Sequence, residues 1–425
     1  MHCLYKTNFN FVYDDDFYNI YLEYLIKKSE LKQNVLIQEI DIPSSTFTRV
    51  KRKGYASNKV VRKALEDYFK IKTVSTEIIK NLQDKLNTVL TYAYYSETQN
   101  EKELFAETLK FNEQTKNSPI RRLYWSLLSI AYNPVLAKSD EAMQILDNEV
   151  DFIEYMVNHL PIESEYVVTY ALYEYALHKD DYKLAVKYTK RLEELLPQIP
   201  ESLQSLGNFI CMSAAILERD HSKALKFINR SLELQNTFFA PKIFIAVKYH
   251  LFSLYSILND YEKMADLGER EILYLQFATK DQAFYYCFLI GLVQAYIALE
   301  RYAEAEEIFN TLDKYDLDNS NISPGQVKVF KIKKDFLNIN RLFMYYKQKN
   351  ELKFDEVAKI CEQSNLGQNL NLKDYVAVIR YFKKRNINSL KNANKMLMEL
   401  GKNLNTLTSQ IHYILTNELK SIYTK

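Results

Sequence analysis

The chain has 425 residues, 47% of them hydrophobic and 26% charged, a composition typical of globular proteins and unlike that of disordered chains. With only 7 Gly and 8 Pro it has little material for the tight turns of a sheet, so the composition favours helices. The formal net charge of +2 gives no sign that the chain as a whole binds nucleic acid, and the longest uncharged apolar stretch, 285–299, is too short to span a bilayer.

The first 74 residues are predicted to form a small helical domain. Apolar spacing indicates helices over 17–28 and 33–40, and Pro43 then interrupts the pattern because proline disfavours helix in the residue before it. From residue 27 to residue 75 the chain carries 12 Lys or Arg against 5 Asp or Glu, a net charge of +7. Such a basic region on a neutral chain is typical of a nucleic-acid-binding module, although a solvated basic helix would give the same count.

Two further helices complete this predicted domain. Ser44 or Ser45 can cap the third helix, which is expected to end at Gly54. Ser57 opens the fourth helix, SNKVVRKALEDYF. Its buried side is expected to include Val60, Val61, Leu65 and Phe69.

A series of helical hairpins is predicted after residue 74. Four segments share an aromatic or histidine anchor that is followed three residues later by a small or flexible apolar residue: Tyr182 and Ala185, His221 and Ala224, Tyr261 and Met264, Tyr302 and Ala305. The anchors are 39, 40 and 41 residues apart, and a weaker copy has Phe354 and Val357. A lone hairpin cannot bury its apolar face, so hairpins stack into a solenoid. We expect anchor and small residue to lie where the two helices of a hairpin meet.

These hairpins resemble tetratricopeptide repeats (TPR). The best copy spans 286–317, with Tyr296 in its first helix and with Tyr302, Ala305 and Phe309 in the turn and second helix. Leu192 and Leu312 stand where the family usually has a small residue late in the second helix, and the period near 40 exceeds the family's 34. The resemblance covers about residues 160 to 365 and implies an all-α protein in which 75–425 form a right-handed TPR-like α-solenoid.

The segment LKQNVLIQEIDIPSSTFTRVKRKG resembles the Xre/Cro-type helix-turn-helix. Ten residues of this chain are similar to those that the family has at the corresponding positions: Leu31, Gln33, Leu36, Ile40, Ile42, Ser45, Thr46, Phe47, Arg49 and Val50. Two positions depart: Ile37 stands where a small Ala is usual, and Asp41 where the turn usually has Gly, although Asp tolerates a left-handed turn better than most residues. The alternative is a helical pair that caps the end of the solenoid.

A helix-turn-helix in residues 1–74 followed by degenerate TPR hairpins resembles the RRNPP group of Gram-positive regulators. The resemblance implies a homodimeric intracellular receptor for a short signalling peptide, whose binding to double-stranded DNA changes with the peptide. Without DNA binding, the same solenoid would be a TPR scaffold or a Rap-like regulator of a protein partner. The segment 49–53 should project to solvent in the first case and pack on the solenoid in the second.

The resemblance also implies DNA-binding residues. The third helix would enter the major groove, where short hydroxyl side chains hydrogen-bond base edges and Arg suits the paired acceptors of guanine. These base contacts would come from Ser44, Ser45, Thr48 and Arg49. Phosphate contacts are expected from Gln33, at the start of the preceding helix, and from Lys51, Arg52, Lys53 and Lys59. Plain solvation is the alternative for each.

Peptide-binding residues are expected on the first helix of each hairpin, because these helices line the concave surface of a TPR superhelix. By register, the inward positions include Tyr170, Glu174, Phe209, Ser213, Tyr249, Ser253, Gln294 and Tyr346. Aromatic faces together with amide and hydroxyl groups suit an extended peptide. Core packing is the alternative for each aromatic, since the chain has 34 Tyr.

Signatures of catalysis are absent from the sequence. The six histidines show no ligand spacing such as HExxH, and there is neither a glycine-rich phosphate loop nor a GxSxG elbow. The sequence therefore predicts no enzyme, no metal and no cofactor, and an enzyme would require a deep polar pocket with clustered carboxylates or histidines. Four separated cysteines and the lack of a signal peptide predict a cytoplasmic protein that does not contact membranes.

Overall fold

The computed structural model describes residues 15–72, isolated positions between 77 and 87, and residues 140–278, 282–315, 324–363, 372–403 and 408–424. Within these ranges every regular element is a helix and none is a strand, so the all-α prediction is confirmed. None of the helices described there has the length and apolarity that a membrane span requires. The chain divides into two compact units, 1–247 and 248–425. The expected domain boundary at 74/75 lies beside undescribed residues and stays a prediction.

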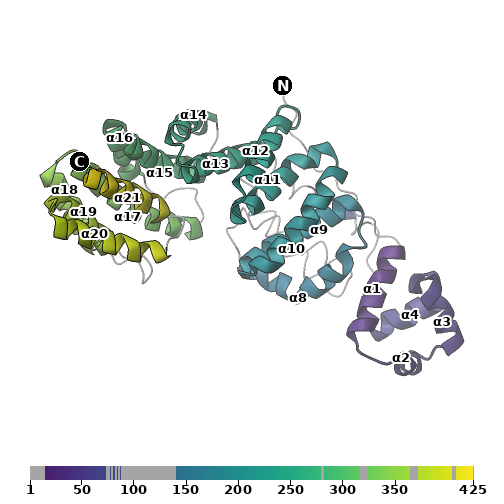
Figure 1. Cartoon of the computed structure of the whole chain (residues 1–425). Helices are drawn as coiled ribbons and strands as arrows, with labels where there is room; N and C mark the ends of the chain where they lie inside the picture. The colour runs from purple at the N-terminus through teal and green to yellow at the C-terminus, as the bar shows by residue number, and fades with distance from the viewer. Residues whose placement is uncertain are drawn as a thin grey trace. The chain divides into compact units, whose positions relative to one another are not determined.

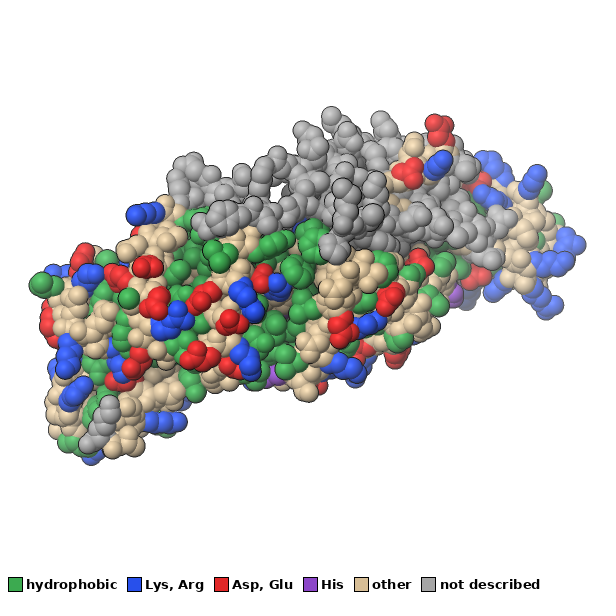
Figure 2. Space-filling view, turned by 90° about the horizontal axis from the view of Figure 1, so that it is seen from above, with side chains coloured by type: hydrophobic (Ala, Val, Ile, Leu, Met, Phe, Trp, Pro, Cys, Tyr) green, Lys and Arg blue, Asp and Glu red, His purple; other side chains and the backbone are tan. Residues whose placement is uncertain are grey.

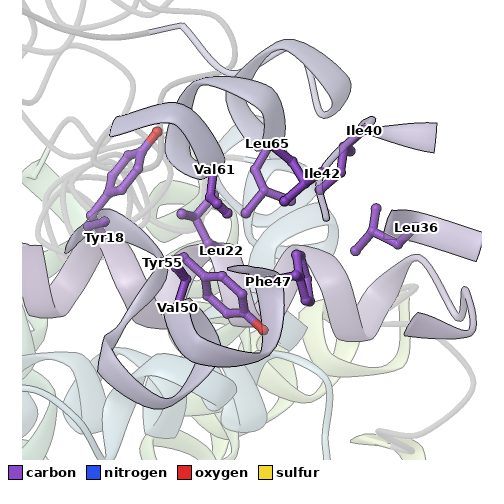
Figure 3. Close-up of a cluster of buried hydrophobic side chains, with 11 residues drawn as sticks. Tyr18, Leu22, Leu36, Ile40, Ile42, Phe47, Val50, Tyr55, Val61 and Leu65 are labelled. Carbon is purple, nitrogen blue, oxygen red and sulfur yellow. The ribbon is translucent and has the colours of Figure 1, made fainter. Parts of the chain in front are cut away.

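The N-terminal domain of the first unit contains four helices around one hydrophobic cluster (Figure 3). The helices are α1 (Asp15–Lys28), α2 (Gln33–Glu39), α3 (Ser44–Lys53) and α4 (Lys59–Tyr68), with a 3-10 turn at Tyr55–Ser57. The cluster contains Tyr18, Leu22, Leu36, Ile40, Ile42, Phe47, Val50, Tyr55, Ala56, Val61 and Leu65. Every helix contributes to it, so the domain has a core of its own.

Two details of the predicted domain are wrong at helix starts. Pro43 precedes α3 and no side chain caps this helix, so neither Ser44 nor Ser45 has the expected role. The fourth helix begins after Asn58. The Oδ1 atom of Asn58 accepts hydrogen bonds from the backbone N–H groups of Val60 and Val61, at 3.0 and 3.1 Å. The 3-10 turn delays the start of α4, and Val60 therefore falls in its first turn, where it is 68% exposed rather than buried.

Antiparallel hairpins account for most of the described residues from 140 onward (Figure 1). In the first unit they use α8 (Asp140–Val157), α9 (Ile162–His178), α10 (Tyr182–Leu195), α11 (Glu201–Leu217) and α12 (His221–Leu234), and the unit boundary falls within α13 (Pro241–Ile257). The second unit continues with α14 (Tyr261–Ala278), α15 (Gln282–Ala298), α16 (Tyr302–Lys314), α17 (Pro324–Lys347), α18 (Glu351–Gln363), α19 (Leu372–Lys384), α20 (Ile387–Leu400) and α21 (Thr408–Thr424). All four predicted anchors are the first residue of a hairpin's second helix.

The turn inside each hairpin has one repeated backbone geometry. A non-glycine residue with positive φ, between 49° and 60°, occupies the same place in six turns: Asp180, Arg219, Asn259, Glu300, Lys349 and Arg385. In the first of them the N–H of Asp181 donates to the carbonyl of Ala176 at 2.9 Å, the six-to-one bond of a Schellman cap. The Asp181 carboxylate then caps the second helix by accepting from the N–H of Leu184 at 3.0 Å. In five of the six turns an Asp or Asn stands directly before the new helix, the exception being Arg301, and the repeat analysis missed this signal.

The small or flexible apolar residues that follow the four anchors are all buried. Ala185, Ala224, Met264 and Ala305 are all 3% exposed or less, so this part of the repeat prediction is confirmed. The aromatic part is wrong for Tyr182, which is 58% exposed. Its hairpin is closed by the capped turn and by the alanine, and the aromatic ring is not needed for the contact.

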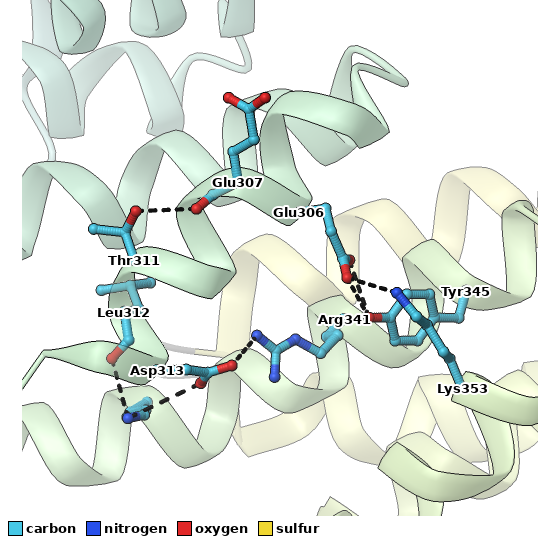
Figure 4. Close-up of polar contacts among 9 residues, drawn as sticks. Glu306, Glu307, Thr311, Leu312, Asp313, Arg341, Tyr345 and Lys353 are labelled. Carbon is cyan, nitrogen blue, oxygen red and sulfur yellow. Dashed lines mark hydrogen bonds and ion pairs between the residues drawn. The ribbon is translucent and has the colours of Figure 1, made fainter.

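Polar contacts add to the packing of α16 against α17 and α18 (Figure 4). The Tyr345 hydroxyl donates to both oxygens of Glu306, at 2.9 and 3.0 Å, and Lys353 reaches the same carboxylate at 2.8 Å. Arg341 donates to Asp313 at 2.7 Å and stacks over the ring of Phe309. These groups are partly exposed, so each pair contributes little alone, and the network mainly fixes the register of neighbouring hairpins.

Overpacking at a hairpin contact should destabilise the second unit. Ala305 is fully buried, so Ala305→Leu should cost about 1–3 kcal/mol of unfolding free energy. The matched control is Ala303→Leu, because Ala303 is an exposed residue of the same helix. Urea unfolding of the two variants measures the difference, and equal stabilities would show that the contact is not tightly packed.

Candidate functional site

The predicted DNA-binding residues all lie on the surface of the N-terminal domain. Gln33, Ser44, Ser45, Thr48, Arg49, Lys51, Arg52, Lys53 and Lys59 are each exposed. On the opposite side of α3, Phe47 and Val50 are 1% and 3% exposed and fix the helix in the domain core. The basic segment 49–53 thus directs its charged side chains to solvent, and Figure 2 shows Lys and Arg side chains gathered over this domain.

The turn between α2 and α3 accommodates both departures from the helix-turn-helix pattern. Asp41 has a φ of 52°, the left-handed conformation for which the family usually uses Gly. The N–H of Ile42 donates to the carbonyl of Ile37 at 3.3 Å and closes the turn. Ile37 itself is half-buried and packs at the margin of the cluster, so its larger side chain does not separate the helices. The helix-turn-helix geometry is compatible with this sequence.

Two predicted phosphate-binding side chains are neighbours. The Lys51 ammonium donates to Oε1 of Gln33 at 3.4 Å, which brings the start of α2 to the side of α3. After the C-terminal end of α3, the Asn19 side chain accepts from the N–H of Ala56 at 2.6 Å and holds the turn that follows Gly54. These two contacts connect α2 with α3 and fix the turn at which α3 ends.

Helix α1 joins this domain to the first described hairpin helix, α8. On its inner face, the Tyr18 hydroxyl donates to Glu66 at 2.7 Å, and this buried carboxylate also accepts from Arg62 at 2.9 Å. On its other face, the rings of Tyr21 and Tyr24 pack on Phe152, with centroids 5.4 and 5.1 Å apart. Sequence reasoning missed this joint, because one helix with two aromatic faces gives no local sign of what each face contacts.

The predicted peptide-binding residues of the first unit lie in two environments. Tyr170 is only 5% exposed, with its ring 6.5 Å from that of Tyr173, so it belongs to the core as the structure stands. Phe209 and Ser213 are half-buried on α11, and the Ser213 hydroxyl donates to the Phe209 carbonyl at 3.1 Å. Glu174 lies on α9, but its side chain is outside the described residues. Phe209 and Ser213 are the pair that keeps some access to solvent.

The corresponding residues of the second unit are also divided. Tyr249 and Ser253 are half-buried on α13, and the Tyr249 ring packs on Phe284 and Phe288, at centroid distances of 5.7 and 5.6 Å. Burial raises the pKa of Tyr249. Gln294 is 7% exposed and presents little surface to a ligand. Burial also lowers the pKa of the neighbouring His250 to about 4, so this imidazole is neutral near pH 7.

Tyr346 contacts the last helix of the chain. Its hydroxyl donates to Oε1 of Glu418 at 3.1 Å, and Lys347 donates to Oε2 of the same carboxylate at 2.9 Å. Burial, followed by the charge of Glu418, raises the pKa of Tyr346 to about 12. The hydroxyl therefore stays protonated and remains a donor at neutral pH. No local signal in the sequence links Glu418 to residues about 70 positions earlier.

Groups of three or more His, Cys, Asp or Glu side chains that could hold a metal do not occur among the described residues. Cys211, Cys287 and Cys361 are not joined in disulfides. Burial raises the pKa of Cys211 to about 12, so this thiol is not a reactive thiolate.

No protein-family model and no curated protein matches the chain. Among solved structures, a Rap protein complexed with competence and sporulation factor is similar with a TM-score of 0.52 and 14% identity, over 82% of this chain and 98% of that chain. The chain has a Rap-like fold. The apo form of RapI aligns with a TM-score of 0.40 and 12% identity, over 92% and 98% of the two chains.

The Rap-like fold confirms the prediction of a TPR-like helical solenoid. At this level of identity the similarity concerns the fold alone. The nine DNA-binding residues and the eight peptide-binding residues therefore stay predictions. The nine lie on the surface, and the peptide-binding residues other than Glu174 lie at half-buried positions or in the core.

The contact between α1 and α4 should be sensitive to one hydroxyl. Tyr18→Phe leaves the buried Glu66 carboxylate with one hydrogen bond fewer and should cost about 1–3 kcal/mol of unfolding free energy. Tyr182→Phe is the control, since Tyr182 is 58% exposed. Urea unfolding followed by circular dichroism compares them, and a neutral Tyr18→Phe would mean that the Glu66 contact adds nothing to stability.

Proposed function

We propose that the chain is a cytoplasmic, homodimeric transcriptional regulator that binds double-stranded DNA through α2, α3 and α4 and a short signalling peptide through its TPR-like solenoid. One observation carries the DNA-binding part. All nine residues selected from the sequence are exposed, while Phe47 and Val50 hold α3 in the core. The proposal includes no catalytic activity and no cofactor.

The chemistry of α3 suits readout of a duplex. Ser44, Ser45 and Thr48 lie at its N-terminal end and offer short hydroxyls for base edges, with Arg49 directly behind them for guanine. Lys51, Arg52 and Lys53 follow in the last turn, where their charges suit phosphates. In a homodimer, two such helices would be about 34–36 Å apart, or a multiple of this, and would select a palindromic site.

Peptide binding by the solenoid is supported by its fold and by its side chains. The similar Rap protein was solved with competence and sporulation factor, so a solenoid of this fold takes a separate ligand. Half-buried rings and hydroxyls, such as those of Phe209, Tyr249 and Ser253, offer stacking and hydrogen bonding to an extended chain. Binding of the peptide would change DNA binding through the α1–α8 joint.

A second candidate function is a regulator of a protein partner that does not bind DNA. The Rap-like fold over 82% of the chain favours it. In that case α2 and α3 would contact a protein, and their basic surface would meet an acidic one.

The two functions differ in how charge removal affects DNA binding. Replacing Lys51, Arg52 or Lys53 by Ala should weaken binding to all duplexes alike and reduce the slope of log K against log salt by roughly 0.9 per lost phosphate contact. Arg49→Ala should cost about 1–3 kcal/mol on the preferred sequence and much less on others. Titration of the purified protein against a pool of random duplexes, at low and moderate salt, measures both the salt slope and the loss of affinity for the preferred sequence.

Lys63→Ala is the matched control for this titration. Lys63 lies on α4 and is 69% exposed, but its partner is Asp67 and it is outside the predicted DNA surface. Its removal should leave the salt slope unchanged. Retention of no duplex even at low salt would refute DNA binding and leave the protein-partner function.

A further inference from the structure

Helix α21 lies against the first helices of the hairpins in the second unit, the side on which peptide binding was predicted. It contacts α15 and α20, and Figure 1 shows it beside α17. An apolar stripe at positions i, i+4 and i+8 is buried, with Ile411 and Leu415 at 0% and Leu419 at 4% exposure. The chain thus covers part of this surface with its own last helix.

Glu418 holds α21 in place through a specific carboxylate contact. Its side chain is only 11% exposed, and its two oxygens separately accept from Tyr346 and Lys347. Lys347 also reaches Glu300 at 3.3 Å. A carboxylate held by one hydroxyl and one ammonium is a strong, charge-assisted arrangement. The Tyr346 hydroxyl and the Lys347 ammonium could donate in the same way to the free C-terminal carboxylate of a short peptide.

Asn340 is the second observation, and it points to a ligand other than a helix. It lies seven residues before Lys347 on α17, so the two share a face of that helix, and Lys347 contacts α21. Asn340 is fully buried, and neither its Nδ2 nor its Oδ1 has a hydrogen-bond partner among the described residues. Burying an unpaired amide is destabilising. Helix α21 cannot pair with it through its backbone, because helical N–H and C=O groups bond to each other, whereas an extended peptide has both groups free.

We propose that Tyr346 and Lys347 form the carboxylate site of a short extended peptide, that Asn340 pairs with its backbone, and that Glu418 of α21 occupies the carboxylate site until the peptide displaces it. The inference rests on peptide binding as proposed above, and it names the site and the competitor. It assigns to α21 the role of an internal ligand. Displacing α21 costs free energy, so the peptide binds more weakly than it would to a site without this helix.

The first test measures whether Glu418 holds α21. Hydrogen exchange of the full chain should be about tenfold faster for the amides of 411–419 in Glu418→Gln than in the unaltered protein, since loss of a charge-assisted hydrogen bond corresponds to about this factor. Glu399→Gln is the matched control, because Glu399 also pairs with a lysine, Lys402, at 2.6 Å, but on an exposed surface. Equal exchange in both variants would overturn the proposal.

The second test uses random heptapeptides in equilibrium dialysis, one pool with a free C-terminal carboxylate and one amidated. Glu418→Gln should retain about tenfold more of the free-acid pool than the unaltered chain, and the amidated pool should be retained poorly. Asn340→Leu added to Glu418→Gln should lose this retention while α21 exchange stays fast. If all variants retain both pools equally, the proposed carboxylate site is refuted, while the proposal that the solenoid binds a peptide stands. If no variant retains either peptide pool, both the proposed site and peptide binding by the solenoid are refuted. The DNA-binding proposal would still be decided by the duplex titration.

Discussion

Two antiparallel helices can bury only the stripe along which they touch, and in this chain their remaining faces are also apolar. Helix α15 shows the consequence most clearly, because from Tyr286 to Ile297 nearly every side chain is buried between α14, α16, α17 and α21. Such a helix is stable only with neighbours on all sides. The capped turns, the small residues at helix contacts and the return of α21 all follow from this need, since each brings another apolar face out of water.

The same need explains why the basic α3 can face solvent. The N-terminal domain has its own core, and it meets the first hairpins through the aromatic face of α1. Because α1 supplies both the domain's core residue Leu22 and the joint residue Tyr24, the surface of α2 and α3 is left uncovered. A functional surface of long cationic side chains requires such a division, since burying those charges without partners would be unfavourable.

Local signals in the sequence predicted the helices well, and long-range contacts escaped them. Pro43 and Gly54 bound α3, and the anchors mark the starts of four second helices, because breakers and apolar spacing act over a few residues. Whether a ring is core or surface depends on neighbours far along the chain, so Tyr182 and Val60 were placed wrongly and Tyr170 turned out to be buried. For the same reason, the pairing of Lys347 with Glu418 could not be inferred from either residue's surroundings.

The fixed turn inside each hairpin also determines where the chain tolerates changes of length. Five of the six turns have three residues between their helices, whereas the connections between hairpins that the structure describes throughout have five residues, between Leu195 and Glu201, and six, between Leu234 and Pro241. A Schellman cap followed by a capping Asp or Asn allows no extra residue without breaking its hydrogen bonds. From the start of a first helix to the next anchor the chain has 20 residues each time, at 201–220, 241–260 and 282–301, so the drift in anchor spacing from 39 to 41 residues arises in the second helix and the connection that follows it. Changes of length are therefore tolerated after the turn of a hairpin rather than inside it.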